Sequence, residues 1–171
     1  DFRSKNMILP EGLPTVEEAS NETAAVVLNT LPDSATELKA WFDGKEFQAI
    51  YFKNCIKEAY YLTGYGTREQ FARLYKTIYQ FPEFDVRYKL DDLSHYLKID
   101  KILLIKMIQI FDELDFVTID NGVMTVNKEA EKREIEESKI FQDLKRLVKF
   151  QELMALGTPQ EIYDWLYKQE Q

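Results

Sequence analysis

The sequence predicts an α+β fold: a small α/β (βαβ) lobe followed by a winged helix-turn-helix lobe and C-terminal helices. Three patterns predict it. Residues 24–53 alternate as strand, helix and strand. Residues 85–126 follow the order of a short helix, a turn, a longer helix and a β-hairpin, which is the order of a winged helix-turn-helix. Helical patterns occupy most of residues 138–167. We therefore expect two lobes, residues 1–62 and residues 63–171.

The first lobe begins with an apolar run at residues 24–29, which is typical of a buried strand. Ser34 is a candidate N-cap, with Glu37 three residues later as in a capping box. The helix predicted over residues 35–42 leads to a second apolar strand at residues 47–53. Short connections favour parallel strands and a right-handed crossover. The connecting loop has no glycine-rich phosphate motif, so we expect no nucleotide site there.

The second lobe begins after a flexible-looking stretch at residues 63–67, which contains two glycines. Residues 68–81 predict an amphipathic helix. The next helix has one apolar edge, formed by Leu90, Leu93 and Leu97. Residues 101–114 then predict a helix that is apolar around most of its surface and suited to burial. Asn121-Gly122 lies between two β-branched runs and predicts a tight hairpin.

Two more helices complete the prediction. The first spans about residues 138–153 and has apolar residues at helical spacing. Thr158 as N-cap, Pro159 at the first helical position and Glu161 two residues further predict the start of the last helix.

Composition limits the classes of function. The chain has 171 residues, 45% of them hydrophobic and 30% charged, which is ordinary for a globular protein. No apolar run approaches the roughly 20 residues that span a bilayer, so we expect no membrane association. The single cysteine, Cys55, suits a reducing cytoplasm. The chain begins at Asp1 rather than methionine, so we expect a piece of a longer protein. Its net charge of −8 means that nucleic acid would need a local basic patch.

Catalysis by this chain is not predicted. His95 is the only histidine, and a lone histidine on a short helix is usually structural. One cysteine and one histidine cannot form a zinc site. Three pairs of adjacent acids could in principle hold metal ions, but they lie where solvated helix faces are expected: Asp91-Asp92, Asp112-Glu113 and Glu136-Glu137. We therefore expect no catalytic residue, cofactor or metal ligand in this chain.

Cations interleaved with aromatic residues suggest single-stranded DNA as a partner, because cations bind phosphates and aromatic rings stack on bases. The candidate phosphate contacts are Arg68, Arg73, Lys76, Arg87 and Lys89. The candidate stacking residues are Tyr65 and Tyr88. The alternative is that these tyrosines are part of the core and the cations a solvated face. Base reading in duplex DNA is not favoured, because the helix at residues 101–114 is mostly apolar.

A protein-docking role is a further alternative. The last predicted helix carries Tyr163, Trp165 and Tyr167, which could anchor an interface or complete the core.

Several segments together resemble one family. They are residues 71–75 (FARLY), 84–86 (FDV), 107–117 (MIQIFDELDFV), 121–122 (NG), 132–138 (KREIEES) and 141–142 (FQ). They are similar to the C-terminal domain of RecJ-type single-stranded-DNA-specific exonucleases of Gram-positive bacteria. The first lobe, with Val26-Val27-Leu28 and Leu31-Pro32, is similar too, so the resemblance covers nearly the whole chain.

The resemblance implies a non-catalytic accessory domain of a 5′ to 3′ exonuclease that acts in DNA repair and recombination. In that family, the hydrolysis belongs to an N-terminal Asp-His-His core that uses manganese or magnesium, and no such triplet occurs here. The domain would then hold single-stranded DNA or dock a partner, either the parent catalytic core or the single-strand-binding protein. The competing expectation is a protein-interaction module that makes no DNA contact of its own.

Overall fold

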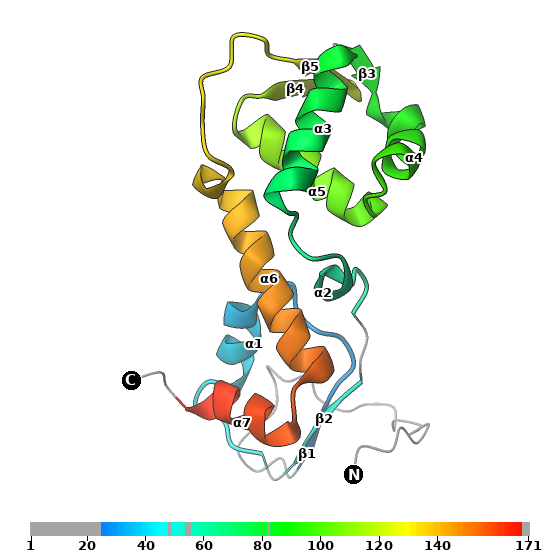
Figure 1. Ribbon diagram of the computed structural model, residues 1–171. Helices are drawn as coiled ribbons and strands as arrows, with labels where there is room; N and C mark the ends of the chain where they lie inside the picture. Colours follow the sequence, from blue (N-terminus) through cyan, green and yellow to red (C-terminus); the bar gives the residue numbers. More distant parts are fainter. Residues whose placement is uncertain (1–24, 48, 54–55, 82, 169–171) are drawn as a thin grey trace. The chain divides into compact units, whose positions relative to one another are not determined.

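The computed structural model describes residues 25–47, 49–53, 56–81 and 83–168 (Figure 1). Contacts divide the chain into two compact units, Asp1–Cys55 and Ile56–Gln171. The lobe boundary proposed from the sequence, after residue 62, falls inside the short helix α2 (Tyr60–Thr63). Cys55 lies outside the described residues.

The first unit is a βαβ element, as predicted. Strand β1 (Ala25–Leu28) and strand β2 (Ala49–Phe52) are parallel, with Ala25 opposite Ala49. Helix α1 (Ala35–Phe42) connects them, and the Ser34 hydroxyl accepts a hydrogen bond from the Glu37 backbone N–H at 3.2 Å. Because this cap satisfies one of the free N–H groups of the helix, α1 begins where the sequence predicted.

The second unit is mixed α and β, so the predicted α+β class is confirmed. Its remaining helices are α3 (Arg68–Gln80), α4 (Val86–Leu97), α5 (Lys101–Glu113), the 3₁₀ helix η1 (Ile135–Glu137), α6 (Lys139–Leu156) and α7 (Pro159–Tyr167). Its strands are β3 (Glu83–Asp85), β4 (Val117–Asp120) and β5 (Val123–Val126). They form an antiparallel sheet in the order β3-β5-β4. Helix, turn, helix and hairpin follow in the predicted order, while the winged helix-turn-helix assignment stays a prediction.

Local chemistry fixes the turns of this unit. Helix α4 ends at Lys98, whose φ of 54° is left-handed. Helix α5 begins directly afterwards, because the Asp100 carboxylate accepts a hydrogen bond from the Ile102 N–H at 3.0 Å. The hairpin turns at Asn121 and Gly122, with φ values of 49° and 79°. Two consecutive positive φ values are what a type I′ hairpin turn requires, so the Asn-Gly prediction is confirmed.

The core of the second unit is built around α5. Leu104, Met107 and Ile110 are completely buried, as the apolar character of the helix predicted. Ile105 is an exception and is exposed. Helices α3 and α6 contribute Phe71 to this core from one side and Phe141 from another. None of the helices in the described part of the chain is both long and apolar enough to cross a membrane.

Glu113, at the end of α5, fixes the start of α6. Its carboxylate accepts hydrogen bonds from the Ser138 hydroxyl and from the backbone N–H groups of Lys139 and Ile140, the latter two at 3.1 Å. Burial acts to raise the pKa of Glu113, but the bonds from Ser138, Ile140 and Lys139 together outweigh it, and the pKa lies below its ordinary value. Glu113 therefore serves as a second cap for α6, in addition to the cap that Ser138 provides.

Gln151, in the middle of α6, holds the segment before α3. Its amide oxygen accepts a hydrogen bond from the Tyr61 N–H at 3.1 Å, and its amide nitrogen donates to the Glu58 carbonyl at 3.0 Å. The side chain is buried, so both groups of the amide are satisfied by backbone. Helix α2 is thereby attached to α6 just before the loop that forms the candidate site.

Candidate nucleic-acid interface

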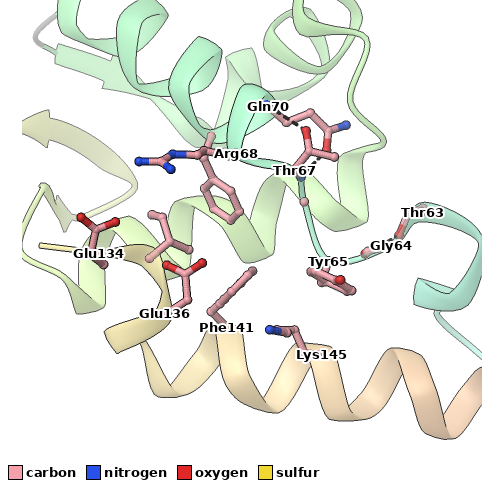
Figure 2. Close-up of a pocket in the computed structure, with 13 residues that line it drawn as sticks. Thr63, Gly64, Tyr65, Thr67, Arg68, Gln70, Glu134, Glu136, Phe141 and Lys145 are labelled. Carbon is pink, nitrogen blue, oxygen red and sulfur yellow. Dashed lines mark hydrogen bonds between the residues drawn. The ribbon is translucent and has the colours of Figure 1, made fainter.

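A pocket of about 480 Å³ lies where the α2–α3 loop, the start of α3, η1 and α6 meet (Figure 2). Its volume falls in the range of small-molecule sites, roughly 300–1,000 Å³. All of its walls belong to the second unit. They are formed by Thr63, Gly64, Tyr65, Gly66, Thr67, Arg68, Gln70, Phe71, Glu134, Ile135, Glu136, Phe141 and Lys145.

Aromatic rings form one part of the pocket. Tyr65 meets Phe141 edge to face, with ring centres 5.8 Å apart, and Phe71 meets Phe141 in the same manner at 5.7 Å. Phe71 and Phe141 are buried, whereas 39% of Tyr65 is exposed. The two phenylalanines therefore support a tyrosine ring that solvent, or a flat ligand, can reach.

Lys145 lies beside two of these aromatic rings. Its Nζ lies 5.6 Å from the ring centre of Tyr65 and 5.4 Å from that of Phe141. These distances are within the range of cation–π attraction. A positive charge is thus held beside the one partly exposed ring of the pocket.

The loop owes its shape to two glycines. Gly64 and Gly66 have φ values of 74° and 91°. A Cβ atom at Gly66 would lie 2.7 Å from Cε2 of Phe71, so a side chain there would displace that ring. Helix α3 then begins with a capping box, in which the Thr67 hydroxyl accepts from the Gln70 N–H and the Gln70 side chain accepts from the Thr67 N–H.

Opposite charges line the rest of the pocket. Figure 2 shows the guanidinium of Arg68 and the carboxylates of Glu134 and Glu136 along one side, with Tyr65 and Lys145 toward the other. The pocket thus presents two cations and two carboxylates around its aromatic part.

The structure brings two of the predicted residues, Tyr65 and Arg68, to this pocket. Arg73 and Lys76 are exposed further along α3. The helical rise of 1.5 Å per residue separates Lys76 from Arg68 by about 12 Å along the axis. At 3.6 residues per turn, Lys76 lies about 80° and Arg73 about 140° around α3 from Arg68, so Arg73 lies on a different side of the helix from the pocket residue.

The remaining predicted residues, Arg87, Tyr88 and Lys89, lie in the first turn of α4 and are exposed, Tyr88 by 78%. The Arg87 guanidinium donates two hydrogen bonds to Asp85, at 3.1 and 2.8 Å, and lies 5.4 Å from the Tyr88 ring centre. Hydrogen bonding to Arg87 lowers the pKa of Asp85 below its ordinary value. Arg87 is therefore already paired, and a phosphate would have to compete with Asp85 for it.

The paired acids have structural partners. Asp91 binds Lys101 at 2.7 Å, Glu113 caps α6, and Glu137 binds Arg133 at 3.1 Å. The His95 ring Nδ1 lies 2.7 Å from the Asp91 carbonyl oxygen. Among the residues that the structure describes, no group of three or more histidine, cysteine, aspartate or glutamate side chains is arranged to hold a metal ion.

Sequence reasoning missed the contribution of α6. Lys145 was not a candidate, although it follows Phe141 by four residues and therefore shares its helix face. The same helix carries exposed Lys139, Arg146 and Lys149 at spacings of seven and three, which place them on one side. Arg146 also binds Asp143 at 2.9 Å. At 3.6 residues per turn, Lys139 and Arg146 lie about 160° and 140° around α6 from Phe141, so this basic row runs along another side of the helix than the pocket.

The aromatic residues of α7 have mixed environments. Trp165 is partly buried, and its ring lies 5.6 Å from that of Phe150. Tyr163 is 52% exposed and lies 4.8 Å from the Tyr167 ring. Trp165 therefore helps to attach α7 to α6, while Tyr163 remains on the surface.

Two comparisons with known proteins point to the same family. The family described as the C-terminal domain of single-strand DNA-specific exonuclease matches residues 3–166. The chain is also 28% identical over 145 residues to the single-stranded-DNA-specific exonuclease RecJ of Bacillus subtilis strain 168. That alignment covers 85% of this chain and 18% of the length of the relative. No solved structure matches the chain.

Proposed function

The chain belongs to the family of C-terminal domains of single-strand DNA-specific exonucleases, and from this premise we propose that it holds single-stranded DNA for its parent enzyme. The observation that carries the proposal is the position of Lys145 beside the partly exposed ring of Tyr65, in a pocket that Arg68 also lines. A ring on which a base can stack, with cations beside it, is the combination that single-strand binding uses.

Exposed cations outside the pocket support a longer binding path for the DNA strand. Arg73 and Lys76 are exposed on α3, and Lys149 is exposed on α6 one turn after Lys145. In an acidic chain, such local groups of cations are what allow contact with a polyanion. The α4 group of Arg87, Tyr88 and Lys89 is a secondary part of the surface, because Asp85 already neutralises Arg87.

The role in the parent protein follows from the family. We propose that the parent is a 5′ to 3′ exonuclease of DNA repair and recombination that acts in the cytoplasm. Its catalytic core would lie in another part of the protein and use manganese or magnesium. This chain would contribute binding rather than hydrolysis. We also retain the proposals that residues 1–62 and 63–171 are separate lobes and that α4, α5 and the β4–β5 hairpin form a winged helix-turn-helix.

Protein docking is the second candidate function. Tyr163 is an exposed aromatic residue on α7, next to the ring of Tyr167, and aromatic residues of this kind often anchor interfaces. The partner would be the parent catalytic core or the single-strand-binding protein. This alternative predicts that the partner is captured and that Tyr163→Ala abolishes the capture, with no salt-sensitive binding of DNA.

The predicted cation surface is tested by charge reversal. The 171-residue chain carrying Arg73→Glu and Arg87→Glu is titrated against a fluorescent single-stranded oligonucleotide, followed by anisotropy. Each lost phosphate contact should weaken binding and make the log–log salt slope shallower by about 0.7. Lys168→Glu, at the residue that follows α7, is the control and should leave both quantities unchanged. Unchanged affinity in the double variant would remove Arg73 and Arg87 from the DNA path.

A further inference from the structure

The acidic side of the pocket restricts what the pocket can bind. A phosphate group placed between Glu134 and Glu136 would be repelled by both carboxylates. The same carboxylates accept hydrogen bonds from N–H donors. The phosphates of a bound strand therefore belong beside Lys145, on the other side of the pocket, and the carboxylate side is suited to the edge of a base.

Glu136 is the carboxylate best placed to accept hydrogen bonds from the edge of a base. The Gln142 side-chain amide donates a hydrogen bond to its backbone carbonyl at 2.8 Å, which holds the backbone of Glu136 in η1, just before α6. Its neighbour Glu137 is occupied by Arg133 and by the Glu134 backbone N–H. Both Glu136 and Phe141 line the pocket, and Figure 2 draws the Glu136 side chain between the labelled Glu134 and Phe141 in this view.

The four bases differ in what they offer to a carboxylate. The Watson–Crick edge of guanine carries two neighbouring donors, N1–H and the N2 amino group, which match the two oxygens of one carboxylate. Adenine and cytosine present one amino donor next to a ring nitrogen that accepts. Thymine presents one N–H donor between two carbonyl oxygens, both of which repel a carboxylate.

We propose that the pocket is a guanine site. The base stacks on Tyr65, and its N1–H and N2 amino groups donate to the Glu136 carboxylate. Lys145, beside Tyr65 and away from the carboxylates, contacts the phosphate of that nucleotide. This proposal deepens the proposed function. The binding of a strand rests on that function, whereas the contact with guanine does not, because a mononucleotide can also present the base.

The test uses the 171-residue chain and fluorescent decathymidylates that carry one central guanine, hypoxanthine, adenine or thymine. Guanine and hypoxanthine have nearly the same ring surface, but hypoxanthine lacks the N2 amino group. A bidentate contact should make the guanine strand bind about tenfold more tightly than the all-thymine strand, with hypoxanthine in between. Glu136→Gln should reduce the guanine preference to about twofold or less. Glu134→Gln, on the same side of the pocket, should keep it.

A second probe separates the two proposals. Deoxyguanosine monophosphate is examined by saturation-transfer NMR with the same variants, after circular dichroism has shown that they are folded. Transfer that Glu136→Gln abolishes would support the guanine site even if no strand bound, in which case the proposed strand-holding function would fail alone. Strands that bind equally whatever their central base, or equal affinity for guanine and hypoxanthine, would overturn the guanine site and leave strand holding intact. Loss of preference in Glu134→Gln instead of Glu136→Gln would overturn the assignment to Glu136. Absence of binding by strands and mononucleotide alike would overturn both proposals.

Discussion

The ammonium group of Lys145 lies 5.6 Å from the centre of the Tyr65 ring, which joins the middle of α6 to the loop before α3. Tyr65 is also in edge-to-face contact with Phe141, one helical turn before Lys145. The ring of Tyr65 thus contacts the core through Phe141, while part of the tyrosine remains open to solvent. A base and its neighbouring phosphate would meet the ring and the cation together.

Removal of the ring should weaken binding of single-stranded DNA. For Tyr65→Ala, we expect the affinity for a decathymidylate to fall about tenfold, because stacking of one base is worth roughly 1–3 kcal/mol. Tyr96→Ala removes an exposed tyrosine of α4 that does not line the pocket and should leave the affinity unchanged. Anisotropy titration of both variants measures the effect. Equal affinities of the two variants would show that Tyr65 does not stack on the strand.

The two loop glycines provide a matched pair of substitutions. Both have positive φ, so Gly64→Ala and Gly66→Ala should each cost about 1–2 kcal/mol of stability. Only a methyl group at Gly66 would also collide with Phe71, whereas the space around Gly64 is open. Urea unfolding should therefore show the larger loss for Gly66→Ala, accompanied by weaker DNA binding. A larger loss for Gly64→Ala would contradict this account of the loop.

Much of the fold could be predicted because its signals are local. The Asn121-Gly122 turn and the Thr158 cap each depend on a few adjacent residues, and both are present as predicted. Three short elements were missed, α2, β3 and η1, because segments of three or four residues are too short to show a period. Strand β3 exists only because it pairs with β5, about 40 residues later in the chain.

The candidate site was predictable only in part. Tyr65 and Arg68 were found because an aromatic and a cationic residue lie three positions apart in the sequence. Lys145 and Glu136 were missed because they reach the pocket from segments more than 60 residues further on, and the order of the chain does not reveal which helix covers which loop. Tyr65 and Tyr88 are both exposed, whereas Tyr60, five residues before Tyr65, is buried.

Gln151 should be essential for the attachment of α2. In Gln151→Ala, the Tyr61 N–H loses its partner, while the Glu58 carbonyl keeps the hydrogen bond from the Tyr60 N–H. We expect a loss of about 2 kcal/mol in the free energy of unfolding, mainly from the buried N–H that is left without a partner. Hydrogen exchange of the Tyr61 amide should become faster. The control is Gln109→Ala, which truncates an exposed glutamine of α5. Unchanged exchange at Tyr61 would argue against the role of this amide.

Glu113 should make stability depend on pH. Its pKa is lowered in the folded state, so its ionised form stabilises the protein at neutral pH, and this contribution is lost as the pH falls below about 4.5 toward the lowered pKa. Glu113→Gln should therefore cost about 1 kcal/mol at pH 7 and progressively less in acid. Urea unfolding of Glu113→Gln and of the exposed control Asp112→Asn, across this pH range, measures the difference. A Glu113→Gln loss that stays constant with pH would contradict the cap.

The central claim is that this domain holds single-stranded DNA, and the most direct measurement is the salt dependence of binding. Fluorescence anisotropy of a labelled single-stranded oligonucleotide, titrated with the 171-residue chain at several salt concentrations, gives the log–log slope. We predict binding at low salt with a slope of about −0.7 for each phosphate contacted. Absence of binding at low salt would contradict the claim and favour docking of a protein partner instead.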